Sequence, residues 1–267
     1  MDFIFIAFLG AIIGSFLNVV IYRLHTGKSL NGRSHCLSCG IGLSWYELVP
    51  VLSYVVLKGR CHHCSSFISP RYLFVEILTG MLFVLSFATA SSDFLLLLTL
   101  FVMVSVLVII LVYDVLHTII PDSLVVLLTL SAGIIVVVTK IPVETAVLSA
   151  FSTSVFFAFF WLISNGRWMG LGDAKLAFPL ALIFSPVEAF SMVVLSFWIG
   201  AVVSIILIGI QNMLRKGKTR LFFLSSQLTI KSEIPFAPFL IFGFIGVYFF
   251  HVDILAITDA FTKFFLG

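Results

Sequence analysis

Four cysteines stand as two closely spaced pairs in the longest polar stretch of the sequence. The pairs are Cys36-Leu-Ser-Cys39 and Cys61-His-His-Cys64, with 21 residues between them. In a reducing compartment, two CxxC pairs are typical of a tetrahedral zinc site, because thiolate sulfur suits this ion. The sequence therefore predicts that these four residues hold one zinc ion. The ion would also stabilise a segment that has too few apolar residues for a core of its own.

Other readings of the cysteines stay open at this point. Three histidines, His35, His62 and His63, lie beside the pairs and could replace a ligand or support one. Free or redox-active thiols are the alternative to a metal. Disulfides would be favoured if the segment lay outside the cytoplasm.

Two aspartates occur beside long apolar runs, where acidic side chains are costly and usually functional. Asp114 follows an uncharged run that begins at Phe94, and Asp173 lies in Gly170-Leu-Gly-Asp-Ala-Lys175, directly before another run. Counting the runs as membrane spans places both carboxylates at the same depth, on separate helices. If two such carboxylates lie close together, they share a proton. One can then act as a base on water while the other donates to a substrate carbonyl, which is aspartic protease chemistry.

The spacing alone does not single out a protease. A carboxylate pair could equally bind a cation or relay protons in a transporter, or the acids could simply mark helix ends. A third acid at this level, Asp122, follows Pro121 and is expected to cap a helix that starts at Ser123.

The composition shows which elements must position these residues. Of the 267 residues, 61% are hydrophobic and only 10% are charged, whereas soluble domains carry about 25% charged residues. This excludes a soluble globular protein, a disordered chain and a secreted disulfide scaffold. Spans in lipid must be helical because an open sheet would leave backbone groups unpaired. The prediction is an all-α, polytopic membrane protein with about eight transmembrane helices and a zinc-binding cytoplasmic loop. The apolar runs are Phe3–Tyr22, Tyr72–Ala90, Phe94–Tyr113, Ser123–Thr139, Thr145–Ser164, Leu176–Phe184, Ala189–Met213 and Pro235–Phe250.

The distribution of Lys and Arg predicts the orientation. If eight spans alternate, thirteen of the 15 cations lie on one side, and only Lys140 and Lys263 lie on the other. The positive-inside rule then places the 23–71 loop in the cytoplasm and both termini outside. The same rule explains the basic run Leu214–Arg220 without nucleic acid. The last stretch, His251–Gly267, is expected at the membrane interface.

Small residues in the first run predict how it packs. Gly10, Gly14 and Asn18 follow one another at intervals of four, on one face of a helix. Such a face lets a second helix approach closely, and Ser15 and Asn18 are expected to hydrogen-bond across the contact.

Several segments together resemble the type IV prepilin leader peptidase family. They are Gly14-Ser-Phe-Leu-Asn-Val-Val-Ile-Tyr-Arg23, the paired CxxC motifs with Trp45–Tyr54 between them, Ser69-Pro-Arg-Tyr72, Asp114 with Ile120-Pro-Asp122, and Gly170-Leu-Gly-Asp-Ala-Lys175. The resemblance runs from about residue 10 to 180. GxGD alone is a modest signal, but its order after the cysteines is highly specific.

The resemblance implies a bacterial inner-membrane aspartic endopeptidase with Asp114 and Asp173 as its catalytic pair. It would cleave the basic leader of type IV prepilins or type II secretion pseudopilins, after Gly and at the cytoplasmic face. Many members also methylate the new N-terminal residue with S-adenosylmethionine. The implied division is a first helix (1–22), a zinc loop for methyl transfer (23–71) and a peptidase core (72–267).

The implied partners are prepilin substrates and lipid, with no nucleic acid. The residues that bind S-adenosylmethionine and the oligomeric state are not implied. A peptidase without methyl transfer, or an ion-coupled transporter that uses the Asp pair, is the alternative function. Glu76 is a candidate for contact with substrate or cofactor, or else it pairs with Arg71 or Arg23.

Overall fold

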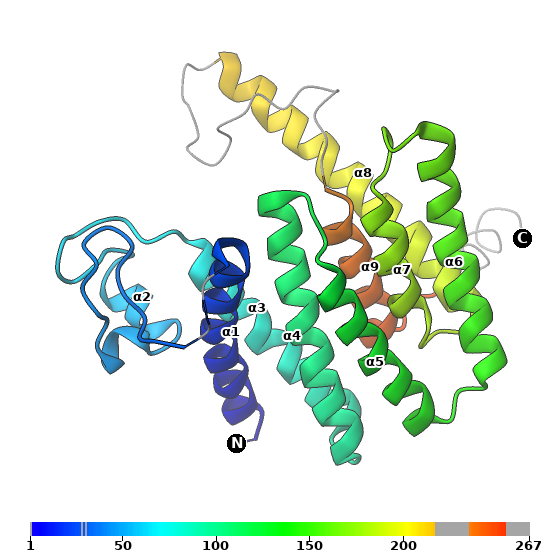
Figure 1. Cartoon of the computed structure of the whole chain (residues 1–267), viewed down its shortest axis with the longest axis horizontal. Helices are drawn as coiled ribbons and strands as arrows, with labels where there is room; N and C mark the ends of the chain where they lie inside the picture. Colours follow the sequence, from blue (N-terminus) through cyan, green and yellow to red (C-terminus); the bar gives the residue numbers. More distant parts are fainter. Residues whose placement is uncertain (1, 28, 30, 217–234, 255–267) are drawn as a thin grey trace, which may run out of the picture. The chain divides into compact units, whose positions relative to one another are not determined.

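The computed structural model describes residues 2–27, 29, 31–216 and 235–254 (Figure 1). These residues form α-helices, one short 3-10 helix and two isolated β-bridges, so the prediction of an all-α fold is confirmed. The helices are α1 (Asp2–Thr26), η1 (Trp45–Leu48), α2 (Leu52–Val56), α3 (Arg71–Ala90), α4 (Phe94–His117), α5 (Asp122–Thr139), α6 (Val143–Ser164), α7 (Leu171–Ala181), α8 (Pro186–Lys216) and α9 (Ala237–Phe250).

A helix lies at each of the eight predicted apolar runs, but their lengths differ. Six are long and apolar enough to cross a membrane, namely α1, α3, α4, α5, α6 and α8. Helix α7 has 11 residues and α9 has 14. At about 1.5 Å per residue, each is shorter than a hydrocarbon core of about 30 Å, so six helices of the described residues have the length of a span where eight were predicted.

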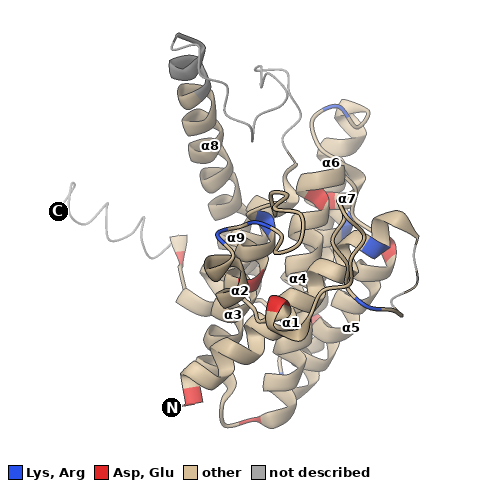
Figure 2. Cartoon of the chain, turned by 90° about the vertical axis from the view of Figure 1, so that its left-hand side faces the viewer, with Lys and Arg blue, Asp and Glu red and all other residues tan. Residues whose placement is uncertain are grey.

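The surfaces of the long helices are those of a protein in lipid. Large apolar side chains such as Phe5, Val137 and Phe151 are more than 60% exposed, at 68%, 75% and 63%. Most of the helical ribbon in Figure 2 carries no charged residue. An apolar surface of this extent would aggregate in water, so the bilayer is the solvent that these helices require.

The chain divides into two compact units, Met1–Lys140 and Ile141–Gly267. In the first unit, α3 packs against α1 and α4, and α4 also contacts α1 and α5. In the second unit, α6 packs against α7 and α8, and α9 packs against α8 and α7. Two predicted segments lie partly outside the described residues. They are the basic run Leu214–Arg220, which extends into 217–234, and the stretch His251–Gly267, which extends into 255–267.

Helices α1 and α3 make the most extensive helix–helix contact of the first unit, on the face predicted from the small residues. A Cβ atom on Gly14 would lie 2.8 Å from Glu76 Cα and 3.0 Å from the carbonyl oxygen of Val75. Asn18 Nδ2 donates to the carbonyl oxygen of Tyr72 at 3.2 Å, so the predicted hydrogen bond across the contact is confirmed for Asn18.

We expect Gly14→Ala to destabilise the first unit, by about 1–3 kcal/mol in the free energy of unfolding. The two nearest atoms that the new methyl group meets belong to the backbone of α3, which cannot rotate away as a side chain would. Gly133→Ala is the matched control, because nothing lies within 4 Å of its Cβ position in α5. Thermal unfolding in detergent should show a lower midpoint for the first variant and no loss for the second. Equal midpoints would contradict the close α1–α3 contact.

Candidate metal centre and catalytic aspartates

The first cysteine pair lies in a tight hairpin. The N–H of Cys36 donates to the carbonyl oxygen of Ile41, and the N–H of Gly40 donates to that of Cys36, both at 2.9 Å. Gly40 has φ +73°, a left-handed conformation that costs glycine little. The turn brings the Cys36 and Cys39 side chains to the same side of the hairpin.

The second pair repeats this geometry with a different residue at the turn. The N–H of Cys61 donates to the carbonyl oxygen of Ser66, and the N–H of Ser65 donates to that of Cys61, again at 2.9 Å. Ser65 takes the place of Gly40 with φ +56°. A serine gives no sequence signal for such a conformation, so the likeness of the two hairpins becomes visible only in the structure.

The two hairpins bring all four cysteines together. The Sγ atoms of Cys36, Cys39, Cys61 and Cys64 lie within 4.8 Å of one another, and the Cys36 and Cys64 sulfurs are 3.8 Å apart. In a tetrahedral site with Zn–S bonds of about 2.3 Å, the sulfurs are separated by about 3.8 Å. The cysteines are thiols, not disulfides. This cluster can therefore bind a metal ion in the way that the spacing predicts.

The electrostatics of the cluster also fit a cation. Hydrogen bonds from the backbone N–H groups of Cys39 and Ser38 lower the pKa of Cys36 to about 6. The Ser66 hydroxyl and N–H lower the pKa of Cys64 in the same way. The Ile41 N–H lowers the pKa of Cys39, but desolvation and hydrogen bonds with Cys36 and Cys64 outweigh it and raise that pKa to about 11. A central cation would stabilise all the thiolates at once.

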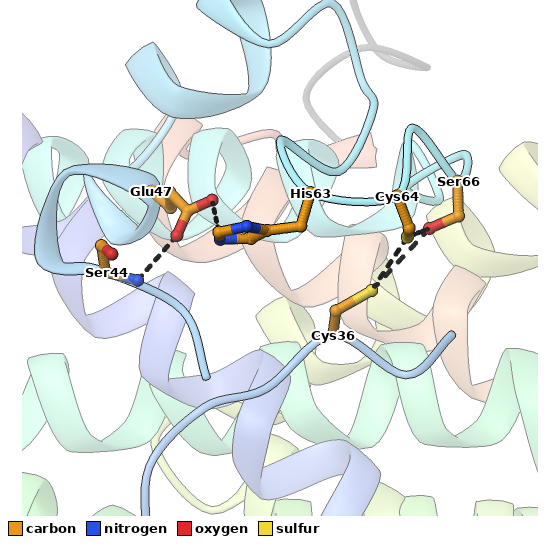
Figure 3. A network of polar contacts seen from close by, with 6 residues as sticks. All are labelled: Cys36, Ser44, Glu47, His63, Cys64 and Ser66. Carbon is orange, nitrogen blue, oxygen red and sulfur yellow. Dashed lines mark hydrogen bonds and ion pairs between the residues drawn. The ribbon is translucent and has the colours of Figure 1, made fainter. Parts of the chain in front are cut away.

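The histidines beside the cysteines do not belong to the group of four sulfurs. His63 Nε2 lies 3.8 Å from Glu47 Oε1, and the Glu47 side chain is only 2% exposed (Figure 3). Glu47 Oε2 also accepts a 2.7 Å hydrogen bond from the N–H of Ser44. With His62, these residues form a second group that could hold a metal ion. Sequence reasoning missed Glu47, although Ser44-Trp-Tyr-Glu47 matches a capping-box pattern that predicts this contact.

Asp114 lies in the last turn of α4, as the span count predicts. It is buried, with 5% of its surface exposed. The helix ends where the N–H of Thr118 donates to the carbonyl oxygen of Asp114 at 2.7 Å, with Thr118 in a left-handed conformation at φ +54°. A carboxylate buried at a helix end, beside the membrane-spanning part, is costly and is typical of a functional group.

Asp173 is also buried, at 7% exposed, but it lies inside α7. The sequence placed it before a helix that begins at Leu176, and this is wrong, because α7 begins at Leu171. The N–H of Gly170 donates to Asp173 Oδ2 at 3.3 Å. An acid in the first turn satisfies a free N–H group and interacts favourably with the helix dipole, so the glycine-rich motif itself starts the helix.

The third acid has a different place from the predicted one. Asp122 is the first residue of α5, and the N-cap is Pro121, which has no side-chain capping bond. The prediction that Asp122 caps the helix is therefore wrong. Asp122 is exposed, whereas the two other aspartates are buried.

Asp114 belongs to the first unit of the chain and Asp173 to the second. The structure describes each carboxylate within its own unit. Their pairing as a catalytic dyad therefore stays a prediction.

Two known protein families match separate regions of the chain. One region contains the four cysteines, and the other contains both buried aspartates. Residues 8–90 match the bacterial peptidase A24 N-terminal domain, and residues 101–205 match the type IV leader peptidase family. No solved structure matches the chain.

Curated relatives match segments of this chain that differ in length. A prepilin leader peptidase/N-methyltransferase from Myxococcus xanthus is 49% identical over 81 residues, which are 30% of this chain and 24% of that protein. One from Vibrio cholerae is 47% identical over 75 residues, which are 25% of this chain and 30% of that protein. The chain thus spans under a third of the length of these two relatives.

A longer match extends over most of a third relative. A prepilin leader peptidase/N-methyltransferase from Klebsiella pneumoniae is 33% identical over 188 residues, which are 66% of this chain and 81% of that protein. Together with six apolar helices, these relatives support a multi-pass inner-membrane protein. The chain belongs to the type IV leader peptidase family.

Proposed function

We propose that this protein is a membrane aspartic endopeptidase that removes the basic leader of type IV prepilins or type II secretion pseudopilins and then methylates the new N-terminus. One observation carries this proposal. The region that matches the leader peptidase family, residues 101–205, contains both buried aspartates, each at the end of a helix. Relatives that match this region are named prepilin leader peptidase/N-methyltransferase.

In the proposed reaction, Asp114 and Asp173 hold one water molecule between them. One carboxylate removes a proton from this water, and the oxygen attacks the carbonyl carbon of the Gly before the cleavage point. The other, protonated carboxyl donates to the carbonyl oxygen, and the amide nitrogen then takes up a proton as the peptide bond breaks. The hydrophobic helix of the prepilin lies beside the spans while its basic leader stays in water.

Methyl transfer is assigned to the 23–71 segment, with one zinc ion held by the four cysteines as a structural ion. S-adenosylmethionine supplies a methyl group on a sulfonium sulfur. When bound, it would give this methyl group to the free amine of the cleaved pilin as the S–CH₃ bond breaks, and the sulfur would keep the electron pair. The amine would lose a proton, and S-adenosylhomocysteine would be the product.

The proposed topology counts all eight apolar helices as crossings, including the short helices α7 and α9, and the charge distribution then sets its direction. The 23–71 segment and the catalytic ends of α4 and α7 face the cytoplasm, and both termini lie outside. Residues 1–22 would then form the first span, 23–71 the methyl-transfer part and 72–267 the peptidase core. The basic leader of the substrate is on the cytoplasmic side as well, which is where the aspartates are needed.

Incubating membranes that contain the protein with a purified prepilin tests the proposal. We expect the leader to be lost and the mature pilin to gain the mass of one methyl group at its N-terminus when S-adenosylmethionine is present. Mass spectrometry of the N-terminal peptide measures both changes. Cleavage without addition of the methyl group would mean that the protein is a peptidase without methyltransferase activity. No cleavage would sink the proposal and favour an ion-coupled transporter that uses the same aspartates.

A further inference from the structure

The first unit contains a cavity of about 810 Å³ between the Cys36–Cys64 segment and the adjoining ends of α1 and α3. Its volume lies within the range of about 300–1,000 Å³ that is usual for small-molecule sites. Two of the metal-cluster cysteines, Cys36 and Cys61, line it. All of its lining residues belong to the first unit, Met1–Lys140.

Asn18 is a lining residue with an unused acceptor. The side chain is 2% exposed, and its Nδ2 group donates to the carbonyl oxygens of Gly14 and Tyr72. Carbonyl oxygens only accept, so these two bonds determine which way the amide points. Oδ1 then has no hydrogen-bond partner within the described residues. A buried acceptor without a partner costs about 1–3 kcal/mol, which a ligand that donates an N–H would recover.

Glu76 contributes a buried carboxylate to the same cavity. It is 8% exposed, and its Oε2 accepts a 2.8 Å hydrogen bond from the N–H of Val51. This bond holds a tight turn in which Val51 has φ +63° and the N–H of Leu52 donates to the carbonyl oxygen of Pro50 at 2.6 Å. The other expectation for Glu76, an ion pair with Arg71 or Arg23, is not among the salt bridges of the described residues. The carboxylate therefore adds a negative charge to the wall of the cavity.

Arg71 contributes the complementary charge. Arg23, another lining residue, uses its guanidinium to bind the carbonyl oxygens of Ser29, Asn31 and Gly32. Arg71 lies above the ring of Tyr72, 5.2 Å from its centre, and its buried Nε has no hydrogen-bond partner among the described residues. The cavity thus combines an unused donor on a cation with an unused acceptor and a buried carboxylate.

We propose that this cavity is the S-adenosylmethionine site of the first unit, with Arg71 binding the carboxylate of the ligand and Glu76 and Asn18 binding its ammonium group. This inference rests on the methyl transfer proposed above. The α-amino-acid end of S-adenosylmethionine carries both charges on neighbouring atoms, and the wall offers both opposite charges. Tyr54 and Tyr72 also line the cavity, and their rings provide a surface on which a purine can stack.

Equilibrium dialysis of the purified full-length protein, with its metal bound and in detergent, tests this assignment. The probes are labelled S-adenosylmethionine, S-adenosylhomocysteine and 5′-methylthioadenosine, which lacks the amino-acid end. Glu76→Gln keeps an acceptor for the N–H of Val51 and removes only the charge. We expect this variant to bind the first two probes about 10- to 100-fold more weakly, since charge-assisted hydrogen bonds are lost.

Arg71→Gln should give a loss of the same order, while neither variant changes the affinity for 5′-methylthioadenosine. Glu144→Gln, at an exposed acid in α6, is the control and should bind all three probes as the unaltered protein does. Metal content and the affinity for 5′-methylthioadenosine should be unchanged in Glu76→Gln, which separates loss of a ligand contact from loss of folding.

Several results would overturn the assignment. The first is that an unaltered protein that methylates pilin shows no saturable binding of S-adenosylmethionine. The second is that both variants bind S-adenosylmethionine with normal affinity. The third is that the variants lose as much affinity for 5′-methylthioadenosine as for S-adenosylmethionine. A raised KM for prepilin with normal cofactor affinity would assign the cavity to the substrate peptide instead. In each case leader cleavage and methylation by the unaltered protein persist. If the unaltered protein performs neither reaction, it is the proposed function that fails.

Discussion

The Asp173→Asn protein is expected to insert and fold normally but to leave the prepilin leader in place. An amide cannot take the proton of the attacking water, so general base catalysis is lost, which lowers rates by about 10²–10⁴-fold. Asp114→Asn should have an effect of the same size, because the two groups act as one unit. The measurement is the rate of leader removal in detergent with a purified prepilin. Combining both substitutions should add little to either one, because groups that act as a unit are not additive.

The third aspartate provides the matched control for this experiment. Asp122→Asn removes a carboxylate near the same membrane depth, but from an exposed position at the start of α5. Its expected cost is that of a favourable helix-dipole contact, about 0.3–1 kcal/mol in stability, with leader cleavage retained. Full activity of Asp173→Asn would end the dyad assignment. Loss of activity only in Asp122→Asn would move the catalytic role to that residue.

Cys61→Ser is expected to release the metal ion and to abolish methylation. Cys61 is the most buried of the four cysteines, at 5% exposed. A hydroxyl is a poor zinc ligand, and the free energy of binding a structural zinc ion is about 10–16 kcal/mol, so the loop should lose its fold with the ion. Cys36 and Cys61 line the proposed cofactor cavity, and for this reason methylation should fall further than leader cleavage.

Elemental analysis of the purified protein should find about one zinc ion per chain before the change and a small fraction after it. Limited proteolysis should then cut the 31–70 segment, which it spares in the unaltered protein. Ser38→Ala, inside the first hairpin, is the control and should keep both metal and methylation. Methylation by a protein with no metal would contradict the structural role of the ion. Retained metal in Cys61→Ser would mean that His62 replaces the thiolate.

The sequence alone determined the all-α membrane class, the places of the apolar helices and which four cysteines come together in a cluster that can bind a metal ion. These features depend on local or repeated properties. A span is recognised by about 20 apolar residues, and a CxxC pair brings its own two thiols together wherever it folds. The close α1–α3 contact was also predictable, because Gly10, Gly14 and Asn18 recur at the helical spacing.

Where the sequence failed, local chemistry competed with the apolar pattern. The predicted helix began at Leu176 because the preceding glycines and Asp173 read as a polar connection. In the structure the N–H of Gly170 donates to that carboxylate, and the motif becomes the first turn of α7. For the same reason the sequence predicted Asp122 as the residue that caps α5, whereas the N-cap in the structure is Pro121. Burial of an acid follows from where its helix begins, and a hydropathy pattern does not show this.

Only the tertiary structure decided what surrounds the four cysteines. The left-handed turn at Ser65, the contact between Glu47 and His63, and the bond from the N–H of Val51 to Glu76 join segments that the sequence treats separately. The unused acceptor of Asn18 is visible only after its donors have found carbonyl partners on α1 and α3. A cavity is the space that remains once all side chains are packed, so its polar groups cannot be read from spacing along the chain.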